Sequence, residues 1–108
     1  MGTFADYRDH VGAVPAKFFK STLFRSERLL LGLNCLEPGQ EQHVHTHAGQ
    51  DKFYFVVEGT GSFTVGDEVR EAGEGWAVWA PADVPHGVAN AGDRRLVLLV
   101  GIAPAPGG

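Results

Sequence analysis

The sequence of 108 residues contains one cysteine, Cys35, no long apolar run and no surplus of basic residues. A single cysteine cannot form an internal disulfide, so we expect a reducing compartment and place the protein in the cytoplasm. The longest apolar stretches, 29–33 and 96–103, are far shorter than the roughly 20 residues needed to cross a bilayer. Residues 1–10 do not resemble a signal peptide, and we expect no membrane association. The formal net charge of −4 gives no reason to expect nucleic acid as a partner.

Helical periodicity is also missing, because no segment sustains an apolar repeat of about 3.6 residues between caps. Instead, 15 glycines and 6 prolines divide the chain into short apolar segments. The pair Gly66 and Asp67 suits a two-residue turn, so the segments on either side should form an antiparallel hairpin. Many short strands joined by tight turns are typical of an all-β sandwich or barrel. The segments with strand character are 17–25, 28–36, 42–47, 52–58, 61–65, 68–72, 75–80, 86–90 and 94–102.

Length and composition predict one domain over residues 1–108. Hydrophobic residues make up 44% of the chain and charged residues 20%, a balance that supports a packed core. The strand segments place the barrel core at about 17–102. Residues before 14 lack a strand pattern and 103–108 form a Pro/Gly-rich tail, so we expect loose termini.

Three histidines occupy alternate positions of the segment 42–47, namely His43, His45 and His47. Successive side chains of a strand alternate between its faces, so we expect all three to point the same way, about 7 Å apart from one to the next. Two such imidazoles can bind one metal ion if the strand bends. The alternative is a polar strand that faces solvent.

A second pattern lies further along, where Gly75 is followed after five residues by Pro81 and then by His86 and Asn90. Together with the first histidine segment, this part of the chain resembles the cupin family over 39–90, about half of the sequence. On the first cupin motif fall Gly39, His45, His47 and Gly59, and on the second fall Gly75, Pro81, His86 and Asn90.

The resemblance implies a double-stranded β-helix, which is a small jelly-roll cupin barrel in which the two motifs form facing hairpins. It implies that His45, His47 and His86 bind one divalent transition metal per subunit, with iron, manganese, nickel or zinc as candidates. Neutral imidazoles from two strands suit zinc, copper, nickel or iron and leave coordination positions for water or substrate. His43 precedes the motif, and it either orients a ligand or lies near the barrel mouth.

The chain departs from the family pattern where a glutamate ligand is expected and Lys52 stands instead. An ammonium group has no lone pair and repels cations. We predict that Gln50 replaces the glutamate, because it shares strand parity with Lys52 and Gly49 permits a bulge. Asp51, or a site of three histidines alone, are the alternatives. We expect Lys52 to be solvated at the strand end; facing inward, it would anchor a substrate carboxylate. Asp83 replaces the second motif's central glycine without changing the spacing.

Two classes of function fit these residues. The first is a metal-dependent enzyme of the dioxygenase, isomerase or lyase type that acts on a small oxygenated substrate, and we favour it. The second is a non-catalytic module that binds a metal or small ligand for sensing or storage. A proton-transfer group near the metal would separate them, and His43, Tyr54 and Lys52 are the candidates. The segments 17–25 and 28–36 carry more apolar surface than one barrel needs, and the resemblance to small cupins implies a homodimer.

Overall fold

The protein consists of β-strands and one short 3-10 helix in a computed structural model that describes residues 2–107. The helix is η1 (Tyr7–Asp9), and no helix in the described residues is long and apolar enough to span a membrane. Every segment with predicted strand character overlaps one strand, so the all-β class is confirmed. The strands are β1 (Phe19–Arg25), β2 (Leu30–Leu36), β3 (Glu41–His45), β4 (Asp51–Glu58), β5 (Thr60–Val65), β6 (Glu68–Gly73), β7 (Ala77–Ala80), β8 (His86–Ala89) and β9 (Leu96–Ala103).

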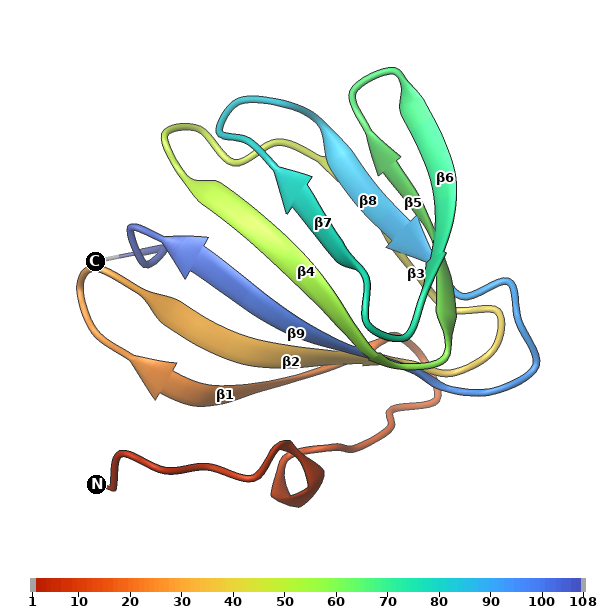
Figure 1. Ribbon diagram of the computed structural model, residues 1–108, viewed down its shortest axis with the longest axis horizontal. Coiled ribbons are helices and arrows are strands. Elements are labelled where there is room, and N and C mark those ends of the chain that lie inside the picture. Colours follow the sequence, from red (N-terminus) through yellow and green to blue (C-terminus); the bar gives the residue numbers. More distant parts are fainter. Residues whose placement is uncertain (1, 108) are drawn as a thin grey trace.

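The strands form two antiparallel sheets that face each other as a jelly roll (Figure 1). The larger sheet has the order β1-β2-β9-β4-β7, and the smaller sheet has the order β3-β8-β5-β6. Neighbouring strands are often distant in sequence, as where β2 pairs with β9 along its whole length. The hairpin predicted from Gly66 and Asp67 is confirmed, because Gly66 has a φ of 58° and β5 pairs antiparallel with β6.

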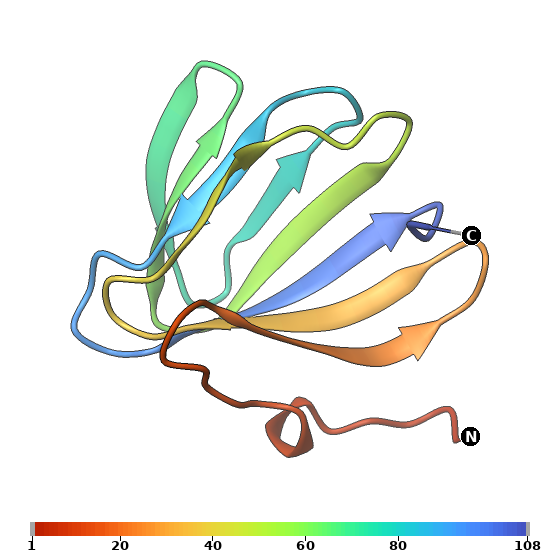
Figure 2. The ribbon, with the colours of Figure 1, turned by 180° about the vertical axis from the view of Figure 1, so that it is seen from behind.

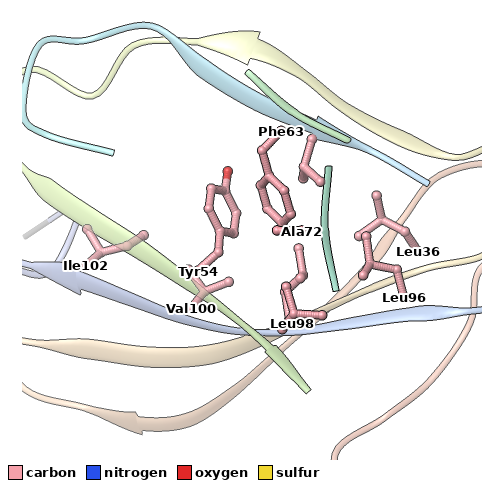
Figure 3. Packing of buried hydrophobic residues seen from close by; sticks show 10 residues of the cluster. Leu36, Tyr54, Phe63, Ala72, Leu96, Leu98, Val100 and Ile102 are labelled. Carbon is pink, nitrogen blue, oxygen red and sulfur yellow. The ribbon is translucent and has the colours of Figure 1, made fainter. Parts of the chain in front are cut away.

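The hydrophobic core fills the space between the sheets, where alternate residues of the strands point inward (Figure 3). Tyr54 and Val56 of β4 and Leu98 of β9 are fully buried. The ring of Phe63 from the opposite sheet lies 5.3 Å from the Tyr54 ring, centroid to centroid. Each large apolar side chain buried here contributes about 1.5–3 kcal/mol. The core therefore fixes the spacing of the sheets, and with it the distance between β4 and the strands β3 and β8.

A second cluster covers the outer face of the larger sheet. Leu33 and Cys35 of β2 and Val97 of β9 point away from the core, yet they are buried because Tyr7 and Val11 pack against them. Both ribbon views show this N-terminal segment, with η1, running outside β1 (Figures 1 and 2). Part of the apolar surface expected to form a dimer contact is thus covered by the protein's own N-terminal segment. Exposed aromatic side chains lie elsewhere, on β4 and β7: Phe53, Phe55 and Trp79.

The C-terminal segment makes contacts beyond the last strand. The backbone N–H of Ala105 donates to the carbonyl of Glu27 at 3.2 Å. The side-chain amide of Gln50 donates to the carbonyl of Pro104 at the same distance. These bonds hold residues 103–107 against the β1–β2 hairpin and the loop before β4.

Candidate metal centre

His45, His47 and His86 come together between the two sheets. Each offers one ring nitrogen, and these atoms all lie within 4.8 Å of one another. His45 and His86 meet because they are directly paired residues of the antiparallel strands β3 and β8. His47 follows just after β3, and its ring centroid lies 4.6 Å from that of His45 and 5.3 Å from that of His86. The fold therefore unites histidines from the two sequence motifs in a site that could hold a metal ion.

His43 does not join this cluster, because strand β3 is irregular between Gln42 and His45. A bulge interrupts the alternation of faces. Gln42 and His45 both line the interior, whereas the side chain of His43 is 86% exposed and lies 2.7 Å from a carboxylate oxygen of Glu41. The expectation that His43 shares a face with the other two histidines is therefore wrong. Gly87 of β8 permits the irregularity, because a Cβ there would lie 2.7 Å from the carbonyl oxygen of Gln42.

Backbone carbonyls fix the orientation of two of the three rings. His45 Nδ1 donates to the carbonyl of His43 at 2.8 Å, and His86 Nδ1 donates to the carbonyl of Val84 at 3.0 Å. A nitrogen that donates to a carbonyl carries the proton, so Nε2 of each of these two rings has a lone pair and no proton. His45 Nε2 accepts a hydrogen bond from His47 Nε2 at 2.9 Å, and metal binding through His47 Nε2 would require the proton of that ring to move to Nδ1. His86 Nε2 is buried and has no partner within residues 2–107.

A transition-metal ion fits this donor set. Metal–nitrogen bonds of about 2.0–2.1 Å hold neighbouring ligand nitrogens roughly 3.0–3.4 Å apart. The 2.9 Å between the Nε2 atoms of His45 and His47 is close to that range, and the limit of 4.8 Å for the whole set requires only small side-chain movements. An ion would also satisfy His86 Nε2, whose unpaired burial otherwise costs about 1–3 kcal/mol.

The surroundings of His47 and His86 disfavour their protonated forms. Burial lowers the pKa of His47 to about 4, and the charges of Lys52 and of the other two rings act in the same direction. Burial is also the main cause of the lowered pKa of His86, again with a contribution from Lys52. Metal ions bind neutral imidazole, so both rings are in the competent form at pH 7.

Lys52, at the position of the family's glutamate, points into the barrel and is only 3% exposed. Its Nζ lies 3.4 Å from the amide oxygen of Gln42 and 4.7 Å from the centroid of the Tyr54 ring. The expectation of a solvated lysine is wrong, because even-numbered residues of β4 face the interior and Lys52 keeps that alternation. Burial, with a smaller contribution from the charge of Lys20, lowers the pKa of Lys52 to about 8. No carboxylate in the described part of the chain forms an ion pair with it.

Tyr54 lies beneath the histidines, with its ring centroid 6.3 Å from that of His86. Its hydroxyl donates to the same amide oxygen of Gln42 that Lys52 approaches. Burial raises the pKa of Tyr54 above its ordinary value, so the hydroxyl stays protonated and acts as a donor. The side chain is part of the core and supports Gln42.

The residues weighed as substitutes for the glutamate differ in position. Gln50 lies beside His47, where its contact partly offsets the lowering of the histidine pKa. Its amide nitrogen is bound to Pro104, which leaves the amide oxygen as the atom for a metal. Asp51 is exposed, and its carboxylate accepts a hydrogen bond from the backbone N–H of Ala82 at 2.9 Å. Gln50 as the fourth ligand stays a prediction.

Asp83 links the two loops that carry the ligands. It has a φ of 68°, a left-handed conformation that aspartate tolerates better than most residues. Its backbone N–H donates to the carbonyl of His47 at 3.0 Å, and its carboxylate accepts from the backbone N–H of Gly49 at 3.2 Å. The departure from the family's glycine therefore adds a contact between the loop after β3 and the turn before β8.

A cavity of about 460 Å³ opens beside the histidines. Its volume lies in the lower part of the range of roughly 300–1,000 Å³ that is typical of small-molecule sites. Within residues 2–107, no aspartate or glutamate lines it. The apolar side chains of the lining include Leu30, Val100 and Ile102. The polar or cationic side chains include Lys20, Thr22, Asn34, Gln42, His45, His47 and Lys52.

A jelly-roll barrel with a histidine triad beside an internal cavity defines a class of small β proteins that can bind metal. Comparison with known families agrees with this geometry. The family model described as "Cupin domain" matches residues 32–102. The chain belongs to the cupin family.

Similar proteins share both sequence and fold. The uncharacterized protein SCO3923 of Streptomyces coelicolor is 36% identical over 76 residues, which are 70% of this chain and 71% of that protein. The crystal structure of TT1209 from Thermus thermophilus is 42% identical and covers 95% of this chain and 98% of its own, with a TM-score of 0.92. A Klebsiella pneumoniae protein with a double-stranded beta-helix domain is only 19% identical, yet it covers 100% of this chain and 95% of its own with a TM-score of 0.92. These likenesses establish the double-stranded β-helix fold.

Proposed function

We propose that the protein is a metal-dependent enzyme that acts on a small oxygenated molecule in the cavity beside the histidines. The observation that carries the proposal is the convergence of three imidazoles from two motifs, one of which has a buried Nε2 without a partner within residues 2–107. His45, His47 and His86 would hold one divalent transition metal, iron, manganese, nickel or zinc, with the amide oxygen of Gln50 as a fourth ligand. The ion would supply Lewis-acid or redox chemistry at the substrate's oxygens.

The presence of Lys52 in the cavity favours an enzyme over a storage module. A side chain that can carry a proton next to the reacting group is what catalysis requires beyond binding. Of the candidates for this role, His43 points to solvent and the Tyr54 hydroxyl is bound to Gln42. Lys52 lines the cavity together with two of the histidines. The apolar side of the cavity would exclude water from the substrate.

The second candidate function is a non-catalytic module that holds a metal or small ligand. One observation favours it, namely the ammonium of Lys52 at the position where the family places a carboxylate ligand. A nearby positive charge weakens cation binding, and an enzyme would have to overcome this repulsion.

The homodimer stays a proposal, with its location revised. The outer faces of β1 and β2 are partly covered by the N-terminal segment, whereas Phe53, Phe55 and Trp79 are between 38% and 66% exposed. Exposed aromatic side chains on adjacent strands support a contact between two copies there. Light scattering after gel filtration would measure the mass, and Trp79→Lys should shift a dimer toward the monomer. The cytoplasmic location stays a prediction from the lone cysteine, which is buried.

The first experiment is to measure the metal content per subunit by elemental mass spectrometry on protein purified without an affinity tag. We expect about one transition-metal ion per chain in the wild type. His47→Ala should weaken metal binding by more than about 100-fold, because even a residue that only orients a ligand contributes about 10–100-fold. His43→Ala is the matched control, since this histidine is exposed and outside the cluster. Circular dichroism would verify that the variants keep the β fold.

The outcomes separate the two functions. A wild-type metal content in His47→Ala would refute the ligand assignment. If the wild type contains no metal after loading with each candidate ion, the enzyme proposal is refuted and the non-catalytic module is supported. Where metal loads, dioxygen uptake with small diols and keto acids is the first activity screen.

A further inference from the structure

We propose that the cavity is a receptor for a small organic carboxylate and that the carboxylate group pairs with Lys52. This inference rests on the proposed function for the role of the site and deepens it by naming the class of substrate. The residues that carry it are Lys52, Gln42 and the apolar side chains across the cavity.

Lys52 presents a buried positive charge that the protein leaves without a counter-ion in the described residues. Its side chain is 3% exposed, and no ion pair within residues 2–107 includes it. The nearest acceptor is the Gln42 amide oxygen at 3.4 Å, which is long for a hydrogen bond, and the Tyr54 ring covers one side. An ammonium group has three protons to donate. Buried charges are normally paired, so an anion in the cavity would supply the missing partner.

The cavity has a charge opposite to that of the whole chain. Its lining includes Lys20 and Lys52 and, among the described residues, no acidic side chain, although the formal net charge of the protein is −4. A recess lined by one sign of charge concentrates the field and raises the local concentration of oppositely charged ligands. The positive lining of the cavity is therefore available to a small anion.

Gln42 provides a second donor next to Lys52. Its amide oxygen is taken by the Tyr54 hydroxyl and approached by Lys52, which fixes the orientation of the amide. The amide nitrogen can only donate, and Gln42 lines the cavity. The bulge in β3 is what turns this side chain inward. Lys52 and Gln42 thus offer one donor to each oxygen of a carboxylate.

The residues that line the cavity fit a carboxylate better than a phosphate. Phosphate sites typically use arginine forks or successive backbone N–H groups, and no arginine is among the described residues that line this cavity. The buried cation is a single lysine, which matches one negative charge. Leu30, Val100 and Ile102 provide an apolar surface for a short carbon skeleton. A small hydroxy or keto acid combines these features, and its second oxygen would face the histidines that share the cavity.

The test is to titrate lactate into metal-free protein, with lactamide as the uncharged analogue of the same shape. Binding is measured by calorimetry and by the NMR signals of the Lys52 ε-methylene group, which we expect the nearby Tyr54 ring to shift away from those of the other lysines. We expect lactate to bind about 10–100-fold more tightly than lactamide, the range set by a hydrogen bond to a charged group. Lys52→Met should abolish this preference. Lys17→Met is the control, because Lys17 is exposed and does not line the cavity.

Equal binding of lactate and lactamide, or unchanged lactate binding in Lys52→Met, would overturn the inference. Tighter binding of inorganic phosphate than of lactate would overturn the choice of carboxylate. The wild-type NMR titration does not depend on any variant, and a Lys52 signal that does not shift when lactate is added counts against the proposal. If lactate binds through Lys52 but no metal loads, the inference stands and the enzyme proposal fails. If metal loads but lactate binding does not depend on Lys52, the enzyme proposal stands and the inference fails.

Discussion

Replacing Lys52 by methionine should stabilise the metal-free protein at neutral pH. Methionine is similar in length to the lysine stem and keeps its apolar contacts, but it removes a charge that is 3% exposed and has no counter-ion within residues 2–107. The hydrogen bond that is lost is the one to Gln42, whose 3.4 Å length marks it as weak. The free-energy cost of the buried charge, which the substitution removes, should therefore exceed the contribution of the hydrogen bond that is lost.

The pKa of Lys52 sets the magnitude and the pH window. Its value of about 8 in the folded protein compares with an ordinary 10.5, a difference of about 2.5. At about 1.36 kcal/mol for each pKa unit, this amounts to about 3.4 kcal/mol, and water in the adjoining cavity reduces the expected gain to roughly 2 kcal/mol. Between pH 8 and 10.5 the unfolded chain binds the proton more tightly than the folded chain. Wild-type stability should therefore rise with pH through this window, and the cost of the charge is fully present below it.

Urea unfolding followed by circular dichroism, in chelator at about pH 7 and pH 10, measures both effects. At pH 7 the variant should be more stable by roughly 2 kcal/mol, or by roughly 8 °C in Tm. The difference should shrink at pH 10, because the wild type then carries an uncharged amine. Lys17→Met, an exposed substitution, should change stability by no more than about 0.5 kcal/mol. A Lys52→Met protein that is less stable at pH 7, or that retains the wild-type rise between the two pH values, would refute the reasoning.

Three further predictions concern two backbone positions and the metal. Gly87→Ala should destabilise the protein by about 2 kcal/mol in urea unfolding, because its Cβ would meet the carbonyl oxygen of Gln42 at 2.7 Å; unchanged stability would mean that the bulge adapts. Asp83→Val should lower the stability of the protein by roughly 1–2 kcal/mol, because valine tolerates the φ of 68° at this position poorly. Asp83→Gly should fold normally and lose only the hydrogen bond to Gly49. Equal melting temperatures of the two variants would contradict this explanation. Metal at about 100-fold above its Kd should stabilise the wild type by about 2.7 kcal/mol in thermal melts, and chelator should reverse the gain. His86→Ala should show no such response to metal, and a response equal to that of the wild type would exclude His86 as a ligand.

The strands and the histidine triad were predictable because their signals are local or have fixed spacing. Glycine and proline mark the ends of the strands, and the turn at Gly66 needs a positive φ whatever the rest of the chain does. His45 and His86 meet through the register between β3 and β8, which no local pattern specifies. Their pairing was expected only because the two motifs resemble those of a known family.

The errors of the sequence-based prediction come from one inserted residue and from one buried charge. A bulge reverses the alternation of faces, so it turned His43 outward and Gln42 inward. The signal that could have revealed it was Gly87, a glycine within the facing strand where the backbones approach closely. The burial of Lys52 contradicts the usual preference of lysine for solvent, and propensity rules cannot foresee such an exception. The inward direction of Lys52 follows from the alternation of faces along β4 alone, and this alternation should have outweighed the preference of lysine for solvent.

Because Lys52 stands at the position of a ligand glutamate, the binding of a metal ion and the binding of a carboxylate in this site should affect each other. Three neutral imidazoles do not offset the charge of a divalent ion, and Lys52 adds a further positive charge instead of the family's negative one. A carboxylate in the cavity would interact favourably with both charges, so its binding should raise metal affinity. Thermodynamic reciprocity then requires the metal to raise carboxylate affinity by the same factor. The lactate titration repeated with metal-loaded protein measures that factor, and a value of one would mean that the two sites do not interact. A factor above one would explain why a cupin can keep a lysine where a ligand glutamate is expected: the substrate supplies the negative charge that the chain omits.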